Sequence, residues 1–284
     1  MNSRPPEYLD KHKVSQSYNR AAPTYERYAN IQKIVGDELL ERLQWLKIEP
    51  RQILDVGAGT GRLARALGSQ YKKAYVYNID IAPQMMIEAT KQTPSSKQFF
   101  VCADATQLPF IDNDVDLLVS NLMLQWCNDI HAVFAEFWRV LKPDGALFFS
   151  TFGPNTLNEL RHSWAQVDNA SHVNHFLDMH DIGDILLEVG LSNPVMDVEQ
   201  FQFTYNEISK LMKELKYTGA HNITAGRSRG LMGKGKFQAM LAAYEQYRSP
   251  EKLLPVTYEV VYGHALGKIE EVKEENYIPI IARM

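Results

Sequence analysis

The feature that most constrains this chain is a set of three glycines at alternate positions, which directly follows a short apolar segment. Residues 53–61 read Ile-Leu-Asp-Val-Gly-Ala-Gly-Thr-Gly, so an acidic residue, Asp55, precedes Gly57, Gly59 and Gly61. Glycine lets the backbone turn sharply after a buried strand and approach a ligand closely, and the free N–H groups that open the following helix can face that ligand. The pattern predicts a nucleotide-cofactor loop.

A second acidic residue supports this interpretation. Asp80 closes a β-type run over residues 74–80, and in an open α/β sheet an acid roughly 20 residues after the glycines binds ribose hydroxyls. The spacing differs from the Gly-x-Gly-x-x-Gly of dinucleotide sites, whose third glycine makes room for a helix beneath a pyrophosphate. A glycine turn that only joins a strand to a helix is the structural alternative.

The Gly-x-Gly-x-Gly spacing after Asp55 resembles the first motif of class I S-adenosylmethionine-dependent methyltransferases. Their cofactor carries a sulfonium and a carboxylate where a dinucleotide has a pyrophosphate. The resemblance implies S-adenosyl-L-methionine as the cofactor and S-adenosyl-L-homocysteine as its product.

Two hydrophobic periods alternate along the chain, which is typical of a parallel sheet covered by helices on both faces. Helical periods fall at residues 31–46, 61–70, 83–91, 130–141 and 179–190. Strand-like runs fall at 52–56, 74–79, 98–102, 115–120, 146–151 (after a turn at 142–145), 191–197 and 256–262. We therefore expect an α/β fold of the Rossmann-like methyltransferase class, with a seven-stranded, mostly parallel sheet.

A long insertion separates the last two strand-like runs, far beyond the two to five residues of a simple hairpin. It carries helical patterns at 207–215 and 237–247, with a glycine-rich loop at 217–236 between them. The chain divides accordingly into a helical lid, a cofactor-binding α/β core, a helical cap, a last strand and a tail. Their expected bounds are 1–46, 47–200, 201–254, 255–267 and 268–284.

Ligands of such sheets lie beyond the carboxyl ends of the strands, so residues that follow successive strands should meet there. By family resemblance, Asp80 binds the ribose, Ile81 covers the adenine, Asp104 receives its exocyclic amine and Asn121 lies near the methionine part. A helix N-cap is a compatible alternative for Asp104. The full predicted cofactor set is Asp55, Gly57, Ala58, Gly59, Gly61, Asp80, Ile81, Asp104, Ala105 and Asn121.

The loop at residues 221–236 contains two arginines, two lysines and no acid. Guanidinium groups two positions apart on a flexible backbone can hold a carboxylate or phosphate, which makes Arg227 and Arg229 candidate anion ligands. An ordinary solvated surface loop is the alternative.

Several segments together resemble the malonyl-acyl carrier protein O-methyltransferases of biotin biosynthesis, the BioC family. They are Gln16–Ala22 with Tyr25, Met123–Trp126, Thr151–Arg161, His221–Ile223, Gly226–Gly233 and Thr257–His264. The resemblance implies esterification of the free carboxylate of malonyl-acyl carrier protein, or of malonyl-coenzyme A, as the step that starts pimeloyl synthesis.

The resemblance also implies roles for residues outside the cofactor set. Tyr18 would orient the acceptor carboxylate, Trp126 would line the methyl-transfer channel, and Arg227 and Arg229 would bind acyl or phosphopantetheine oxygens, with Arg161 as a second candidate for the carboxylate. Helix packing is the alternative for Tyr18, and a core position for Trp126. Lys234 and Lys236 could dock the acidic carrier protein.

Other functions stay open at this point. The same cofactor half serves methyltransferases that act on a trans-aconitate-like acid or a quinone precursor, and a methyltransferase-fold assembly factor of respiratory complex I. A quinone site would favour apolar lining, whereas a diacid or acyl site needs arginine.

The composition of the chain argues against several other classes of protein. The net charge of −4 argues against a general nucleic-acid binder, and no stretch approaches the roughly 18 apolar residues of a membrane span. Since a signal core is also absent, a cytoplasmic location is expected. Cys102 and Cys127 are too isolated for a zinc spacing, so no metal site is expected.

Overall fold

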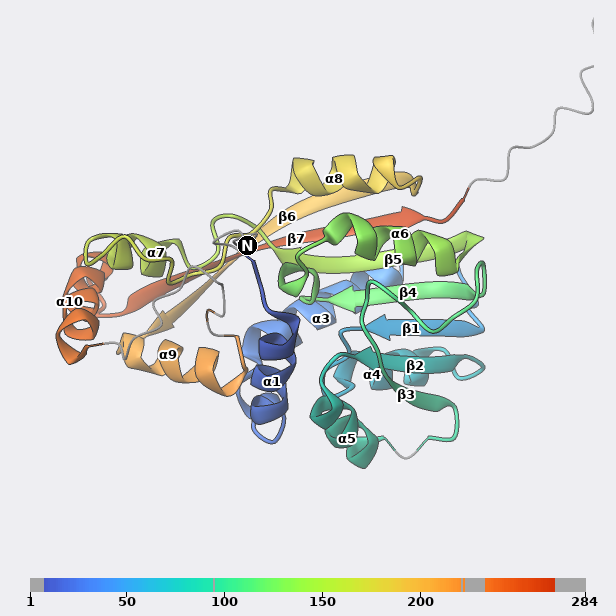
Figure 1. The fold of residues 1–284 in the computed structure, drawn as a ribbon, viewed down its shortest axis with the longest axis horizontal. Coiled ribbons are helices and arrows are strands. Elements are labelled where there is room, and N and C mark those ends of the chain that lie inside the picture. Colours follow the sequence, from blue (N-terminus) through green and yellow to red (C-terminus); the bar gives the residue numbers. More distant parts are fainter. Residues whose placement is uncertain (1–7, 94, 221, 223–232, 269–284) are drawn as a thin grey trace, which may run out of the picture.

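The computed structural model describes residues 8–93, 95–220, 222 and 233–268 (Figure 1). Within them, seven strands form one sheet in the order β3-β2-β1-β4-β5-β7-β6. Strands β1 to β5 run parallel, and β7 is antiparallel to both of its neighbours. The strands are β1 Gln52–Val56, β2 Tyr75–Asp80, β3 Gln98–Cys102, β4 Val115–Asn121, β5 Leu141–Phe152, β6 Ser192–Tyr205 and β7 Leu254–Leu266. The predicted seven-stranded, mostly parallel sheet is confirmed.

The helices fall close to their predicted positions, with additions at the N-terminal end and after β5. They are α1 Lys11–Ala21, α2 Tyr25–Tyr28, α3 Asn30–Leu43, α4 Arg62–Gln70, α5 Pro83–Gln92, α6 Ile130–Val140, α7 Asn158–Ala165, α8 Met179–Glu188, α9 Ile208–Tyr217 and α10 Lys234–Tyr244, with 3-10 turns η1 Leu124–Trp126 and η2 Glu245–Tyr247. In the described ranges, no helix combines the length and apolarity that crossing a membrane requires.

Alternate residues of the central strands enter two separate cores, because successive side chains of a strand point to opposite faces. In β1, Ile53 joins the core beneath α3 and α4, and Leu54 joins the core beneath α6 and α8. Phe148 and Phe149 of β5 divide in the same way. A strand buried on both faces reads as a continuous apolar run, which explains why these strands were recognisable.

The two final strands reach well past the parallel part of the sheet. At 14 and 13 residues, β6 and β7 are far longer than predicted, and α7, α9 and α10 gather around their extended end (Figure 1). β6 continues across residue 200, the expected end of the core, to Tyr205. Leu211 of α9 and Met240 of α10 are fully buried in the same core as Ile53, so the cap packs continuously onto the sheet.

The predicted turn at residues 142–145 lies inside strand β5. Val115 pairs with Leu141 and Leu117 with Ala146, so residues 142–145 form an irregularity in the pairing of β4 with β5. The expectation that the strand starts at 146 was therefore wrong. Proline and glycine signal such a bulge as readily as a turn, since both interrupt regular strand pairing.

Candidate functional site

The glycine loop closes the end of β1 in backbone conformations that suit glycine. Gly57, Gly59 and Gly61 have φ angles of +82°, +55° and +78°. A side chain at Gly57 would overlap Met123, and Gly61 is the N-cap residue of α4. The loop therefore combines left-handed backbone with close approach to its neighbours, as the sequence predicts.

A cavity of about 770 Å³ opens beside this loop, and we call it the glycine-loop cavity. It collects residues from the ends of four strands, as expected of a parallel sheet. The predicted residues that line it are Gly57, Gly59, Asp80, Ile81, Asp104, Ala105, Asn121, Tyr18 and Trp126. Lys11 and Val14 of α1 and Tyr25 of α2 line its other side, so the N-terminal helices form a wall over the strand ends.

Asp80 is held by the backbone around it. Its Oδ2 accepts a hydrogen bond from the Gly59 N–H at 2.9 Å, and its Oδ1 accepts one from the Ala82 N–H at 2.8 Å. Burial raises the pKa of this carboxyl to about 6, and the backbone hydrogen bonds oppose the rise. Each oxygen keeps a lone pair for a second donor, which suits a ligand that presents two hydroxyls.

Asp55 lies deeper than Asp80 and borders a smaller pocket that it shares with Gly57, Ala58 and Asn121. Its side chain is 1% exposed, and Oδ2 has no hydrogen-bond partner within the described ranges. Burial raises the pKa of Asp55 to about 7, the Ala64 N–H opposes this, and the charge of Asp80 adds to it. A buried carboxylate oxygen without a partner is costly, so this pocket suits a ligand with a hydrogen-bond donor or a positive charge.

Asp104 lines the glycine-loop cavity while its oxygens already have partners. Lys11 Nζ lies 2.7 Å from Oδ2, and the N–H and hydroxyl of Thr106 donate to Oδ1. Burial acts to raise the pKa of Asp104, but the hydrogen bonds from Lys11 and Thr106 outweigh it and lower the pKa overall. The local bonds close a turn, and no helix starts here, so the N-cap alternative was wrong.

Asn121 is also fixed on both sides. Its Nδ2 donates to the Gln32 carbonyl at 2.9 Å, and its Oδ1 accepts from the Ser150 hydroxyl at 2.8 Å. The side chain thus ties the end of β4 to the first turn of α3. Across the part of the chain that is described, no group of three or more His, Cys, Asp or Glu side chains is arranged to hold a metal ion.

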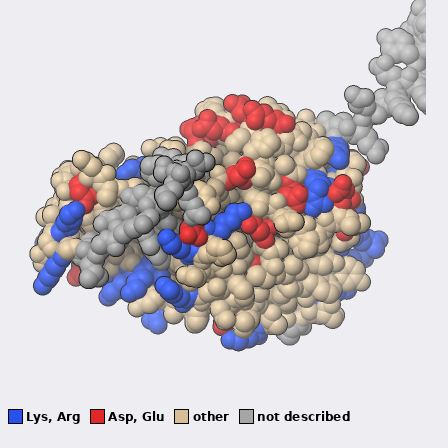
Figure 2. Space-filling model, in the orientation of Figure 1, with Lys and Arg blue, Asp and Glu red and all other residues tan. Residues whose placement is uncertain are grey.

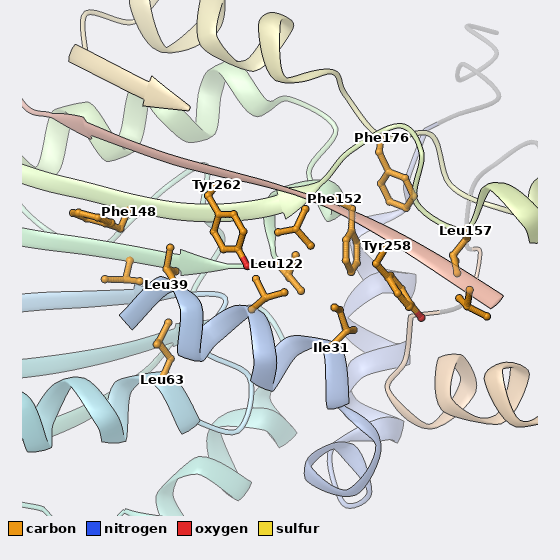
Figure 3. Close-up of a cluster of buried hydrophobic side chains, with 14 of the residues drawn as sticks. Ile31, Leu39, Leu63, Leu122, Phe148, Phe152, Leu157, Phe176, Tyr258 and Tyr262 are labelled. Atoms are coloured by element: carbon orange, nitrogen blue, oxygen red, sulfur yellow. The ribbon is translucent and has the colours of Figure 1, made fainter. Parts of the chain in front are cut away.

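A second pocket of about 650 Å³ lies beyond the end of β5, and we call it the aromatic pocket. Phe152, Phe176 and Tyr258 form one wall, and Ile31 of α3 lies opposite them (Figure 3). Trp126 lines this pocket and the glycine-loop cavity alike. Its ring packs edge-on against Tyr18, with 5.5 Å between ring centroids. One indole therefore borders two ligand-sized spaces.

The arginines and lysines that the sequence predicts as substrate or carrier contacts lie in different surroundings. Arg227 and Arg229 lie outside the described residues. Arg161 lines neither pocket, since its guanidinium donates to the carbonyls of Pro154 and Thr156 at 2.8 and 3.2 Å. Lys234 and Lys236 belong to the first turn of α10 instead of the predicted loop, because the helix starts three residues earlier than its apolar pattern. Lys236 pairs with Asp168 at 2.8 Å.

Three polar residues of the site carried no signal in the sequence. Lys11 belongs to the lid, and Gln32 and Asn174 line the aromatic pocket. None stands in a recognisable pattern, and only the tertiary fold brings them to the strand ends.

Comparison with known proteins identifies the family of this chain. A methyltransferase domain model matches residues 54–149. The malonyl-[acyl-carrier protein] O-methyltransferase of Laribacter hongkongensis is 47% identical over 267 residues, which cover 91% of this chain and 90% of the relative. The protein of the same name from Gallionella capsiferriformans is 46% identical and covers 94% of each chain.

Solved structures agree on the fold. The YcgJ protein of Bacillus subtilis superposes with a TM-score of 0.56 at 14% identity, covering 81% of this chain and 97% of its own. A phosphoethanolamine N-methyltransferase of Haemonchus contortus, solved with S-adenosylhomocysteine, has a TM-score of 0.50 at 15% identity and covers 81% of this chain and 52% of its own. These likenesses show the fold alone, whereas the sequence relatives place the chain in the malonyl-[acyl-carrier protein] O-methyltransferase family of S-adenosylmethionine-dependent enzymes.

Proposed function

We propose that this protein transfers a methyl group from S-adenosylmethionine to the free carboxylate of malonyl-acyl carrier protein, in the cytoplasm. The observation that carries the proposal is the position of Trp126 between the glycine-loop cavity and the aromatic pocket. A donor in the first space and an acceptor in the second would meet at this side chain. The apolar described wall of the aromatic pocket suits a quinone as well as an acyl arm, and the named relatives favour the acyl arm.

The residues of the glycine-loop cavity fit S-adenosylmethionine. Asp80 offers two oriented oxygens for the ribose hydroxyls, and Ile81 and Ala105 provide apolar surface for an adenine ring. The unpartnered Oδ2 of Asp55 and the pocket around it suit the ammonium group of the methionine part. When bound there, the cofactor supplies an electrophilic methyl group on a sulfonium.

The acceptor needs little chemical activation. A carboxylate is already ionised at neutral pH, so its oxygen needs only to be placed in line with the methyl group. Well-oriented reactants can gain on the order of 7–11 kcal/mol from positioning alone. We therefore assign this protein a positioning role without a general base, in which the N-terminal helices also exclude water.

Tyr18 and Trp126 are the proposed contacts at the point of transfer. Burial raises the pKa of Tyr18 well above its ordinary value, and the charges of Tyr25 and Asp80 add to the effect. The phenol thus remains a hydrogen-bond donor for the acceptor carboxylate. Trp126 lines the channel and fixes the ring of Tyr18. Arg161 supports the Thr156 wall of the aromatic pocket, and Arg227 and Arg229 remain the proposed anion ligands.

The decisive test combines the purified protein, labelled S-adenosylmethionine and malonyl-acyl carrier protein, with mass spectrometry of the product. The expected product is the malonyl methyl ester, formed together with S-adenosylhomocysteine. Cofactor binding without any methyl transfer would support the assembly-factor alternative instead. Transfer to trans-aconitate or a quinone precursor, but not to malonyl thioesters, would also refute the proposal.

We further propose that the outer face of α9 docks the acidic carrier protein. Lys210, Lys213 and Lys216 are exposed and spaced three residues apart, so they share one side of the helix. Figure 2 shows lysine and arginine side chains gathered at this end of the molecule. The inner face of the same helix, through Glu214 and Leu215, lines the aromatic pocket. A carrier bound to α9 would stand beside the pocket that receives its acyl group.

Lys234 and Lys236 of α10 are the second part of this proposed face. Lys234 is exposed, while Lys236 is engaged by Asp168. We therefore expect α9 to contribute more to docking than α10.

Charge reversal tests the docking face. Replacing Lys210, Lys213 and Lys216 by Glu should raise the KM for malonyl-acyl carrier protein by about tenfold or more, because like charges would then oppose the carrier. The KM for malonyl-pantetheine, which lacks the carrier, should change less than about twofold. Replacing Lys234 and Lys236 by Glu should also raise the KM for malonyl-acyl carrier protein, but by a smaller factor.

A matched control removes the effect of net charge. Lys47, Lys72 and Lys73 are exposed and lie in connections that precede β1 and β2, away from the carboxyl ends of the strands. Their triple reversal changes the net charge equally and should leave both KM values unaltered. Docking on α9 would be contradicted if both triple variants raised the KM for malonyl-acyl carrier protein equally. It would also be contradicted if the α9 variant raised the KM for both substrates equally.

A further inference from the structure

Two side-chain amides in the aromatic pocket carry buried oxygens without partners. Asn174 is 7% exposed, and its Oδ1 makes no hydrogen bond to any described residue. The Oε1 of Gln32 is likewise buried and makes no hydrogen bond to any described residue. Both residues line the aromatic pocket. An unpaired buried polar atom costs about 1–3 kcal/mol, and native proteins keep few of them, so each calls for an explanation.

The surroundings of the two amides limit what can satisfy them. The described lining of the pocket is mostly aromatic and aliphatic, and it includes no lysine or arginine. Its charged member, Glu214, already accepts a hydrogen bond from the Tyr205 hydroxyl at 2.7 Å. A neutral ligand with hydrogen-bonding groups along an extended, weakly polar chain matches this lining better than an anion does.

The positions of the two residues differ. Gln32 also borders the small pocket that contains Asp55 and Gly57, and its backbone carbonyl accepts the Asn121 amide. It therefore lies on the side of the aromatic pocket that faces the cofactor residues. Asn174 comes from the segment between α7 and α8 and does not border the cofactor residues.

We propose that Asn174 binds a secondary amide of the pantetheine arm that links the acyl group to its carrier, and that it thereby selects pantetheine thioesters over simpler malonyl thioesters. The inference rests on the proposed function. A secondary amide presents one N–H donor and one carbonyl acceptor, and a primary side-chain amide can pair with either. Gln32 lies where the acyl end of the same acceptor must arrive.

The test compares acceptors that differ in their amides. For Asn174→Leu, an apolar substitution of similar size, kcat/KM for malonyl-pantetheine should fall about 10- to 100-fold, since a bound amide would lose its partner. The rate with S-ethyl malonyl thioester, which contains no amide, should stay within about twofold. Gln32→Leu should lower kcat/KM for both acceptors, because both place a malonyl group next to the cofactor residues.

A stability measurement separates this role from a structural one. Removing an unpaired buried carbonyl relieves its desolvation cost, so Asn174→Leu should leave the Tm of the ligand-free protein unchanged or higher. A lower Tm would show that Asn174 supports the fold, and would overturn the inference. The inference would also be overturned if Asn174→Leu lowered kcat/KM equally for both acceptors, or for neither.

Failure of this inference is distinguishable from failure of the proposed function. If the wild-type protein methylates malonyl-pantetheine and the Asn174 variant does so equally well, only the amide assignment is refuted. If the wild-type protein methylates neither malonyl-acyl carrier protein nor malonyl-pantetheine, the proposed function itself is refuted.

Discussion

At the scale of single residues, the site depends on groups whose ionisation the fold has shifted. Asp80 has a pKa of about 6 and Tyr18 a pKa well above its ordinary value, in both cases chiefly because of burial. Near pH 7.5 the first is an acceptor and the second a donor, which matches the hydrogen bonds that a ribose and a carboxylate would need.

Cofactor affinity should therefore depend on pH. The pKa of Asp80 is raised, so its carboxylate is lost as the pH falls through about 6, and with it the acceptor for the ribose hydroxyls. The Kd for S-adenosylhomocysteine, measured by calorimetry, should rise about tenfold between pH 7.5 and pH 5. Asp55 titrates nearby, with a pKa of about 7. Asp80→Asn should bind weakly throughout and lose the dependence around pH 6, and a retained dependence would assign it to Asp55.

Tyr18→Phe tests the proposed donor at the transfer point. The substitution keeps the ring that packs on Trp126 and removes the hydroxyl. We expect kcat to fall by about tenfold to a hundredfold, as for loss of a hydrogen bond to a charged group, with the Kd for S-adenosylhomocysteine nearly unchanged. Tyr71→Phe, which removes a hydroxyl from a tyrosine that lines neither the glycine-loop cavity nor the aromatic pocket, serves as the control. Equal activity of the Tyr18 variant and wild type would reduce Tyr18 to a packing residue.

At the scale of elements, polar contacts join α1 to both halves of the site. Lys11 reaches Asp104 and Thr106 on the far side of the glycine-loop cavity, at 2.7 and 3.2 Å. The Ser17 hydroxyl donates to the Gly219 carbonyl just after α9. The lid is thus joined both to the cofactor residues and to the cap that lines the acceptor pocket.

Loosening α1 should weaken cofactor retention slightly. The Lys11–Asp104 pair is partly exposed, and such pairs contribute about 0.2–1 kcal/mol. Lys11→Met should therefore raise the Kd for S-adenosylhomocysteine about two- to fivefold and speed amide hydrogen exchange in α1. Lys13→Met on the same helix, which removes a pair with Asp10 at 4.0 Å, should change neither the Kd nor the exchange rate. Unchanged exchange in the Lys11 variant would show that the pair does not hold the lid.

The elements that the sequence predicts are those with a clear apolar period. Strands buried on both faces and helices α3 to α6 were recognisable for this reason. Helix α7 was not, because it buries Glu159 and Ser163 beside Leu160 and Trp164. The Glu159 carboxylate accepts hydrogen bonds from the Thr257 hydroxyl and N–H, a partner about 100 positions away that no local pattern reveals. Lys11, Gln32 and Asn174 escaped prediction for the same physical reason.

At the scale of the whole molecule, the cap and the sheet share one hydrophobic core. Met240 and Tyr244 of α10 are completely buried in the core that also contains Val35 and Ile53. Continuity of this kind favours a single cooperative unfolding transition over separate melting of the cap.

Met240→Ala tests that cooperativity. Truncating a fully buried methionine costs about 2–5 kcal/mol, which for a chain of this size lowers Tm by roughly 3–8 °C. Scanning calorimetry should show one transition displaced as a whole. Met212→Ala, at a partly buried position on α9, should produce a smaller displacement. A new low-temperature peak beside an unshifted main transition would mean that the cap unfolds on its own.

The place of β7 between β5 and β6 has a consequence for how the chain is made. Among the described strands β7 leaves the ribosome last, yet β6 hydrogen-bonds to no other strand. Until Leu254–Leu266 has been synthesised, β6 has no partner, and the far edge of β5 stays open. The parallel half of the sheet can assemble early, but the lobe that surrounds the aromatic pocket must wait for late, long-range pairing. A nascent chain would therefore form its cofactor-binding half before it could accommodate a second reactant.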